Sequence, residues 1–182
     1  LQLSNNFDSN LMYGDNYGYM SSLNKAMEFH LKLKSKYLIN TYKINSKKNV
    51  LDIGSNDGTF LKFFNKKNNL FACDPTIKKF KNFYRKDINL FPNFFSADIF
   101  NGKKFDLITS IAMFYDLPDP LMFARDIESI LKNDGVWHIE MSYMPSMIKK
   151  NSYDTICHEH LEYYSIKSLD FLMKKANLKI IN

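Results

Sequence analysis

The segment Val50-Leu51-Asp52-Ile53-Gly54-Ser55-Asn56-Asp57-Gly58 decides the fold. Its apolar residues predict a short buried strand, and its glycines predict a tight turn before a helix over about residues 59–64. In a doubly wound α/β fold, such a unit presents backbone N–H groups to a ligand beyond the strand end. Gly54 can adopt a positive φ, and Gly58 lets the helix start close to its strand.

The spacing and charge of this turn narrow the kind of ligand. The glycines read G-x-x-x-G, whereas a turn that binds a dinucleotide reads G-x-G-x-x-G. Asp52, Asn56 and Asp57 would repel a diphosphate and favour a ligand that carries positive charge. S-adenosylmethionine, with its amino group and sulfonium, is such a ligand, and we expect it as the cofactor.

Two acidic residues farther along the chain support a nucleoside site. Asp74-Pro75 follows a second apolar strand, about 20 residues after the turn, where a carboxylate meets the ribose hydroxyls of a nucleoside. Asp98 follows a third strand and could accept a hydrogen bond from an adenine amino group. The alternative role of Asp98, a simple helix cap, stays open.

Strands and helices alternate along most of the chain. We expect strands at 50–53, 70–73, 90–95, 105–111, 136–141 and 178–181. Helices are expected at 59–64, 76–84, 121–131 and 166–176, with Asn133-Asp134-Gly135 as the stop of the third. The alternation predicts a Rossmann-like, doubly wound and mainly parallel sheet with right-handed crossovers.

The first 45 residues form a separate unit in this interpretation. Residues 1–19 are rich in tyrosine and glycine and read as a loop, in which Tyr17 and Tyr19 either line a ligand site or pack on the domain. Ser21 or Ser22 is expected to cap a helix over residues 23–42. Residues 46–182 would be the cofactor-binding domain.

Composition excludes several classes of protein. The 182 residues are 45% hydrophobic, enough for the core of one domain, and no run of about 18 apolar residues predicts a membrane helix. The net charge is +6, but the lysines are scattered, so we expect no nucleic-acid partner. Two cysteines, Cys73 and Cys157, fit a reducing compartment, and we expect a cytoplasmic protein. The oligomeric state stays open.

The motifs along the chain carry a family resemblance. Val50–Leu61, Cys73–Pro75 and Ser96–Phe100 together resemble the core of class I S-adenosylmethionine-dependent methyltransferases. The segment Asp154–Ser165, which reads DTICHEHLEYYS, resembles the signature of the nucleotide-sugar C-methyltransferases. That family methylates a ring carbon next to a keto group in deoxysugar biosynthesis. The resemblance implies the class I methyltransferase fold and a nucleotide-sugar substrate.

The sequence also departs from the pattern of that family. Its members usually carry an N-terminal zinc module with Cys-x-x-Cys pairs and a C-terminal domain, and neither is found in these 182 residues. We therefore expect the methyltransferase core alone, without the last strand or strands of the fold. Where the family tends to have a histidine before Pro-Asp, the chain reads Phe114–Asp119, and Cys157 stands where a tyrosine is common.

The His-Glu-His triplet at 158–160 is the expected catalytic segment. Carbon becomes nucleophilic only when a base removes a proton next to a carbonyl and a donor holds the enolate oxygen. We expect His160 as the base, Glu159 to orient an imidazole or touch the substrate, and Tyr17 or Tyr19 to donate to the oxyanion. His158 is the remaining catalytic candidate.

Alternatives stay open for this segment and for the reaction. In an extended chain, His158 and His160 point to the same side and could share a metal ion, although the sequence specifies no third ligand and we expect none. Transfer to oxygen or nitrogen, or a cofactor-binding fragment without activity, also fits the sequence. The expected cofactor-binding residues are Asp52, Gly54, Ser55, Asn56, Gly58, Asp74, Pro75, Asp98, Ile99, Ser110 and Met113.

Overall fold

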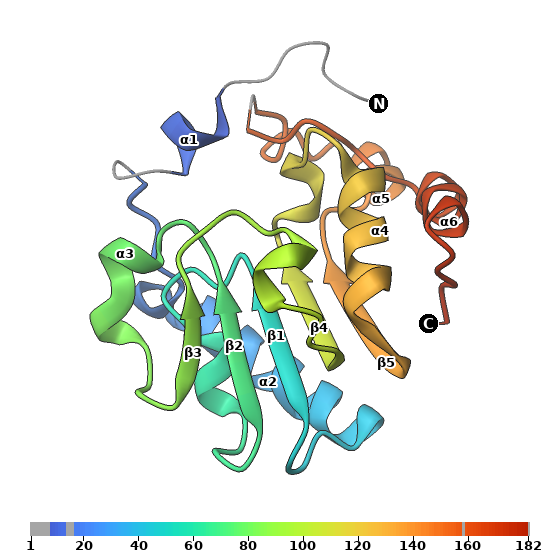
Figure 1. Ribbon diagram of the computed structural model, residues 1–182. Helices are drawn as coiled ribbons and strands as arrows, with labels where there is room; N and C mark the ends of the chain where they lie inside the picture. Colours follow the sequence, from blue (N-terminus) through green and yellow to red (C-terminus); the bar gives the residue numbers. More distant parts are fainter. Residues whose placement is uncertain (1–7, 14–16, 158, 182) are drawn as a thin grey trace.

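The computed structural model describes residues 8–13, 17–157 and 159–181 (Figure 1). His158 and residues 14–16, which belong to the segments discussed above, lie outside the described residues. The core is one sheet of five parallel strands in the order β3-β2-β1-β4-β5. The strands are β1 (Asn49–Ile53), β2 (Asn69–Cys73), β3 (Ile88–Phe91), β4 (Phe105–Ile111) and β5 (Leu131–Glu140). The predicted Rossmann-like parallel architecture is thus confirmed.

Helices cover both faces of this sheet (Figure 1). The α-helices are α1 (Ser9–Met12), α2 (Lys25–Tyr42), α3 (Ile77–Phe80), α4 (Pro120–Ile130), α5 (Met144–Lys150) and α6 (Ile166–Lys175). Short 3-10 helices are η1 (Ser21–Leu23), η2 (Phe60–Phe63), η3 (Lys81–Phe83), η4 (Ala97–Phe100) and η5 (Phe114–Asp116). The helix predicted after the glycine turn is therefore the single 3-10 turn η2.

The core has two parts because neighbouring residues of a strand face opposite sides of the sheet. On β1, Val50 packs with α2 and η2, whereas Leu51 packs with α4 and α6. In Figure 1, α2 lies behind the sheet and α4 in front of it. Phe114 is fully buried and meets the rings of Trp137 and Tyr164 at centroid distances of 5.4 Å. Burial on both faces explains why the strands are nearly continuous apolar runs.

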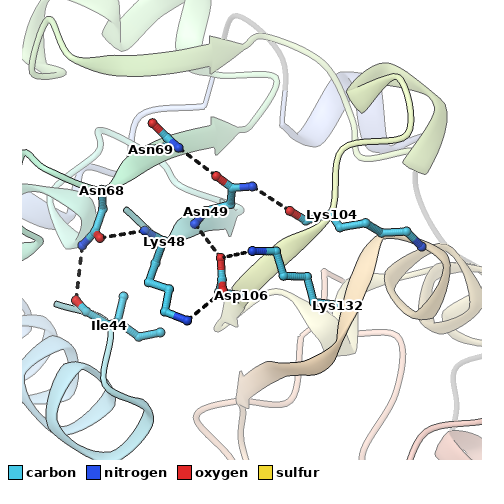
Figure 2. A network of polar contacts seen from close by, with 8 residues as sticks. All are labelled: Ile44, Lys48, Asn49, Asn68, Asn69, Lys104, Asp106 and Lys132. Atoms are coloured by element: carbon cyan, nitrogen blue, oxygen red, sulfur yellow. Dashed lines mark hydrogen bonds and ion pairs between the residues drawn. The ribbon is translucent and has the colours of Figure 1, made fainter. Parts of the chain in front are cut away.

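A polar network joins the amino-terminal ends of the strands (Figure 2). Asp106, which is 8% exposed, accepts hydrogen bonds from the Lys48 and Lys132 ammonium groups and from the Asn49 backbone N–H. Although burial alone would raise it, these bonds lower the pKa of the Asp106 carboxyl. The network ties β1, β4 and β5 at the end of the sheet opposite the glycine turn.

The structure corrects two predicted elements near the carboxyl end. Residues 178–181 form no strand among the described residues, and Leu178 instead donates its N–H to the Met173 carbonyl and packs on the core. The segment Asn133-Asp134-Gly135, predicted as the stop of the helix at 121–131, lies inside β5, because α4 already ends at Ile130. A Cβ on Gly135 would stand 2.7 Å from the Phe105 carbonyl oxygen. The register shift of β4 against β5 falls at this close approach.

The amino-terminal helix begins later than predicted. Asn24, and not Ser21 or Ser22, caps α2 by accepting the N–H groups of Ala26 and Met27. No helix in the described part of the chain is long and apolar enough to cross a membrane. The expected boundary between residues 45 and 46 stays a prediction.

Candidate functional site

The glycine turn after β1 has the backbone geometry that its sequence predicts. Gly54, Asn56 and Gly58 all adopt positive φ, at 72°, 52° and 74°. The Gly54 N–H donates to the Cys73 carbonyl at 2.9 Å, and the Gly58 N–H donates to the Ser55 carbonyl at 2.8 Å. The turn therefore rests against the end of β2 and curls back on itself beyond the sheet.

Tyr84 packs against this turn and is hydrogen-bonded to it. Its hydroxyl donates to the Asn56 carbonyl at 2.6 Å and lies 2.8 Å from the Ser55 Oγ. Gly58 faces the ring, and a Cβ built there would stand 2.4 Å from Cδ1 of Tyr84. Gly58 thus makes room for Tyr84 rather than for a ligand, and it does not line the cavity described below.

Asp74 at the end of β2 is bound into the same turn. Its Oδ1 accepts the N–H and the hydroxyl of Thr76, and its Oδ2 accepts the Asn56 N–H at 2.8 Å. Burial raises the pKa of this carboxyl. Because each carboxylate oxygen has about two lone pairs, Oδ2 keeps capacity for one further donor, such as a ribose hydroxyl.

Asp52 and Asp57 have different surroundings, although the sequence suggested one role for both. Burial raises the pKa of Asp52 to about 7, while a 2.7 Å hydrogen bond from the Thr109 hydroxyl opposes that effect. Asp57 is fully buried and accepts the N–H groups of Ser22 and Thr59. Asp52 lines the cavity, whereas Asp57 fastens the amino-terminal segment to the turn.

The tyrosine-rich segment lies over the turn. The Asn56 side chain accepts the Ser21 N–H at 2.9 Å and donates to the Tyr19 carbonyl at 2.9 Å. The Lys79 ammonium group donates to the Tyr17 carbonyl at 2.9 Å. Tyr17 and Tyr19 both line the cavity, in agreement with the interpretation that they belong to a ligand site.

These elements enclose a cavity of about 530 Å³ at the carboxyl ends of the strands. Its volume lies in the range of small-molecule sites. Among the described residues no lysine, arginine or histidine lines it, while six aspartates do. The aspartates are Asp8, Asp52, Asp74, Asp116, Asp119 and Asp126. The ionised carboxylates among them favour a cationic ligand and disfavour a diphosphate, and their oxygens accept hydrogen bonds, so the lining fits S-adenosylmethionine.

The predicted cofactor residues divide into two groups by position. Those that line the cavity are Asp52, Gly54, Ser55, Asn56, Asp74, Pro75 and Met113. Asp98, Ile99 and Ser110 lie outside it, as Gly58 does. Asp98 is exposed on η4, Ile99 packs on the core, and the buried Ser110 accepts the Trp137 indole N–H at 3.1 Å.

Asp98 lies outside the cavity because β3 ends earlier in the chain than predicted. We expected the strand to reach residue 95, but β3 ends at Phe91. Asn93, Phe94 and Phe95 therefore follow the strand and line the cavity where Asp98 was expected. These three residues were not predicted as site residues. A prediction that β3 ends at Phe91 would have placed them at the cavity.

The described residues of the expected catalytic segment, Glu159 and His160, do not line the cavity, and His160 instead contacts Tyr115, which precedes the cavity residue Asp116. Nδ1 of His160 is 2.7 Å from the Thr155 carbonyl oxygen, and its ring packs on Tyr115 at a centroid distance of 4.3 Å. A carbonyl can only accept, so Nδ1 is the donor in this bond, and Nε2 is the nitrogen that has the lone pair in the neutral imidazole. Glu159 is exposed, yet its charge raises the pKa of Tyr13, Tyr17 and Asp116.

Asp116 is a further cavity residue that was not predicted from the sequence. It ends η5 and lines the cavity, and Tyr13 donates a hydrogen bond to its carboxyl group. In the sequence, Asp116 is notable only because it lies in Phe114–Asp119, where the chain departs from the family pattern. Its surroundings come from Tyr13 and Glu159, which are distant in the chain.

No group of three or more His, Cys, Asp or Glu side chains in the described part of the chain could hold a metal ion. His138 lies in β5, and its pKa is lowered by burial and by the charge of Lys34. Glu140 instead joins His30 and Lys34 at 2.6 and 2.8 Å, which ties β5 to α2.

Known proteins resemble this chain over most of its length. The C-methyltransferase NovU of Streptomyces niveus is 26% identical over 141 residues, which cover 73% of this chain and 33% of NovU. The chain thus spans about a third of the length of this curated relative.

Solved structures show the same fold. A Haloferax volcanii protein in complex with the Trm112 methyltransferase activator has a TM-score of 0.70 at 18% identity, covering 88% of this chain and 74% of its own. The plantazolicin methyltransferase BpumL with SAH has a TM-score of 0.66 at 18% identity, covering 82% and 64%. YcgJ of Bacillus subtilis has a TM-score of 0.65 at 17% identity, covering 81% and 68%.

The family itself is shown by sequence. Residues 27–182 match the family described as "Methyltransferase domain", which is most of the chain. The expectation of S-adenosylmethionine as the cofactor is confirmed at the level of this family. With its parallel sheet and its cavity at the strand ends, the chain belongs to the methyltransferase domain family.

Proposed function

We propose that this domain transfers the methyl group of S-adenosylmethionine to a carbon next to a keto group, on a sugar linked to a nucleotide. The observation that supports the proposal is the orientation of His160, whose ring packs on Tyr115, the chain neighbour of the cavity residue Asp116. The bond from Nδ1 to the Thr155 carbonyl holds a proton on Nδ1, so the neutral imidazole would present its Nε2 lone pair as the general base. A base of this kind is what carbon methylation needs in addition to a methyl donor.

The cavity residues would hold the cofactor in this proposal. The Asp74 carboxylate accepts a ribose hydroxyl, Asp52 faces the cationic part, and Gly54 leaves room beside Met113, where a Cβ would stand 3.0 Å from that side chain. When bound, S-adenosylmethionine supplies an electrophilic methyl group on its sulfonium. The protein then has to orient the acceptor and to move a proton.

The residues of the chain perform the proton chemistry. Nε2 of His160 takes the proton from the acceptor carbon, and the electron pair of the C–H bond becomes the enolate. Glu159 orients the imidazole or contacts the substrate, and His158, which directly precedes Glu159 in the chain, remains a further catalytic candidate. Burial raises the pKa of Tyr17 to about 12, so its hydroxyl stays protonated at neutral pH and can donate to the enolate oxygen. Tyr19 offers a second donor.

The likeness to NovU supports carbon as the methylated atom, since that relative is a C-methyltransferase. None of the described residues around the cavity is basic, so the cavity offers no cation that could bind the diphosphate of the substrate. The keto sugar would enter the cavity, while its diphosphate would stay outside the ring of aspartates. Methylation of oxygen or nitrogen is the second candidate, because neither needs a carbon acid.

Hydrogen exchange separates these candidates. The protein is incubated in deuterated water with a keto-deoxysugar nucleoside diphosphate and without S-adenosylmethionine, and deuterium at the carbon next to the keto group is followed by NMR. Enolate chemistry predicts catalysed exchange that the His160→Ala variant loses. The exposed Asp134→Asn variant serves as the matched control, with exchange as in the wild type.

The outcomes test the proposal directly. Methyl transfer without prior exchange would refute enolate chemistry in favour of an oxygen or nitrogen acceptor. Cofactor binding without exchange or transfer would identify a cofactor-binding module without this activity. Unchanged exchange in His160→Ala would refute the assignment of the base.

A further inference from the structure

Asp116 presents an unsatisfied oxygen beside the proposed acceptor site. Its Oδ1 is buried, yet it has no hydrogen-bond partner among the described residues. Tyr13 donates to the same carboxyl group, and the side chain lines the cavity. A buried polar atom without a partner is costly unless a ligand or another group satisfies it. The oxygen is therefore placed to meet a polar atom of a molecule in the cavity.

Two backbone hydrogen bonds fix the turn that carries Asp116, and one of them joins this turn to Glu162, shortly after His160 in the chain. The Asp116 N–H donates to the Met113 carbonyl at 3.1 Å, and the Tyr115 carbonyl accepts the Glu162 N–H at 3.0 Å. The His160 ring packs edge-on against Tyr115, which precedes Asp116 in the chain. The proposed base therefore contacts the same short turn that carries the unsatisfied oxygen, and Asp116 is the residue of the two that lines the cavity.

The charges around Asp116 decide its protonation state. Tyr13 is hydrogen-bonded to it, and the other titratable groups that interact with its charge are Tyr17, Tyr115, Tyr163 and Glu159. Burial raises the pKa of Asp116 to about 8; the Tyr13 hydrogen bond lowers it, and the charge of Glu159 raises it further. At neutral pH about nine-tenths of such a group is a neutral carboxylic acid, which donates a hydrogen bond.

We propose that Asp116 is a further catalytic residue, which donates a hydrogen bond from Oδ1 to the carbonyl oxygen of the acceptor. This inference rests on the proposed enolate chemistry and adds a residue to it. When His160 takes the proton from carbon, the electron pair of that bond delocalises onto the carbonyl oxygen. Asp116 keeps its own proton and stabilises the new negative charge, as a neutral acid in an apolar site can.

The role of donor excludes the role of base for the same side chain. A carboxylic acid donates below its pKa, so activity supported by the donor falls as the pH rises through about 8. A carboxylate base would make activity rise over the same interval. The two roles therefore predict pH profiles of opposite slope.

Two variants and one titration test the proposal. Asp116→Asn keeps a donor that does not titrate, while Asp116→Ala removes the donor. Deuterium exchange of the keto-deoxysugar nucleotide is measured without S-adenosylmethionine, at several pH values on each side of 8. The Asp116 carboxyl is also titrated by carbon-13 NMR, and its signal is assigned by its loss in Asp116→Asn. Asp134→Asn is the control for both measurements.

The expected results are specific to a neutral donor. Exchange by the wild type falls above pH 8, Asp116→Asn retains exchange without that fall, and Asp116→Ala loses about 100-fold, the usual effect of one oxyanion donor. An Asp116 titration near the ordinary pKa of about 4 would overturn the proposal. So would exchange in Asp116→Ala equal to that of the wild type, or an alkaline fall unchanged in Asp116→Asn.

The failure of the proposed function would look different. A wild-type protein that catalyses no exchange at any pH would refute the enolate reaction, and the role of Asp116 with it. Exchange by the wild type that is lost in His160→Ala but unchanged in Asp116→Ala would refute the role of Asp116 alone.

Discussion

Gly58→Ala should destabilise the protein because Gly58 and Tyr84 share a space that excludes a Cβ. The added atom would stand 2.4 Å from Cδ1 and 2.6 Å from Cε1 of Tyr84, under a φ of 74°. Tyr84 is 8% exposed, and its hydroxyl is bound to Ser55 and Asn56. The ring can therefore move only by disturbing the turn that lines the cavity.

Two costs add in this variant. A left-handed φ costs a residue with a Cβ about 1–2 kcal/mol, and forcing an extra carbon into a packed site costs about 1–3 kcal/mol. The sum of about 2–5 kcal/mol is a large part of the usual 5–15 kcal/mol that a domain has. Gly102 has the same φ of 74° with nothing within 4 Å, so Gly102→Ala carries the first cost alone.

Urea unfolding followed by circular dichroism measures both variants. We expect Gly58→Ala to lose about 1–3 kcal/mol more than Gly102→Ala, which is the cost of overpacking. Gly58→Ala should also weaken binding of S-adenosylhomocysteine, whereas Gly102→Ala should leave it unchanged. Equal unfolding free energies in the two variants would refute the close packing of Tyr84 against the turn.

Three further predictions concern stability and pH. Asp106→Ala should cost about 1–3 kcal/mol in urea unfolding near neutral pH, and because the folded pKa is depressed, this loss should vanish as the pH falls below it. Phe114→Ala should cost about 3–5 kcal/mol by the same assay, since the ring is fully buried. In calorimetric titrations, S-adenosylmethionine affinity should rise with pH through about 7 as Asp52 ionises, and Thr109→Val should move this rise to higher pH.

Each of these predictions has a contradicting result. A loss in Asp106→Ala that is independent of pH would show that the lysine network contributes no charge-dependent stability. A cost for Phe114→Ala below about 1 kcal/mol would contradict its central place in the core. An unchanged pH dependence in Thr109→Val would show that Asp52 does not control the affinity.

The alternation of strands and glycine-marked turns was enough to predict the parallel sheet and the position of the cavity. Each strand and its following turn form a local unit, so Asp52, Gly54 and Asp74 were found from their spacing alone. The segment at 178–181 has the composition of a strand, but Leu178 and Ile180 pack against the core and Ile181 is exposed. A short apolar run does not specify whether it pairs with a sheet or fills a core.

The parts of the site that were missed depend on distant contacts. Asp98 was displaced because β3 ends at Phe91, and strand ends are set by pairing with β2 rather than by local composition. Asp116 ends the short turn η5 after two buried aromatic residues, and the groups that act on it include Tyr13 and Glu159, which are distant in the chain. The local sequence around such a residue shows neither which distant residues contact it nor whether it is buried.

Calorimetric titration of the protein with S-adenosylhomocysteine tests the central claim, that the turn after β1 and Asp74 form the cofactor site. We predict one site per chain in the wild type, weaker binding in Asp74→Ala, and wild-type affinity in Asp134→Asn. Absence of binding heat at high micromolar protein, at two temperatures, would contradict the cofactor site. Binding in Asp74→Ala that equals the wild type would place the cofactor elsewhere.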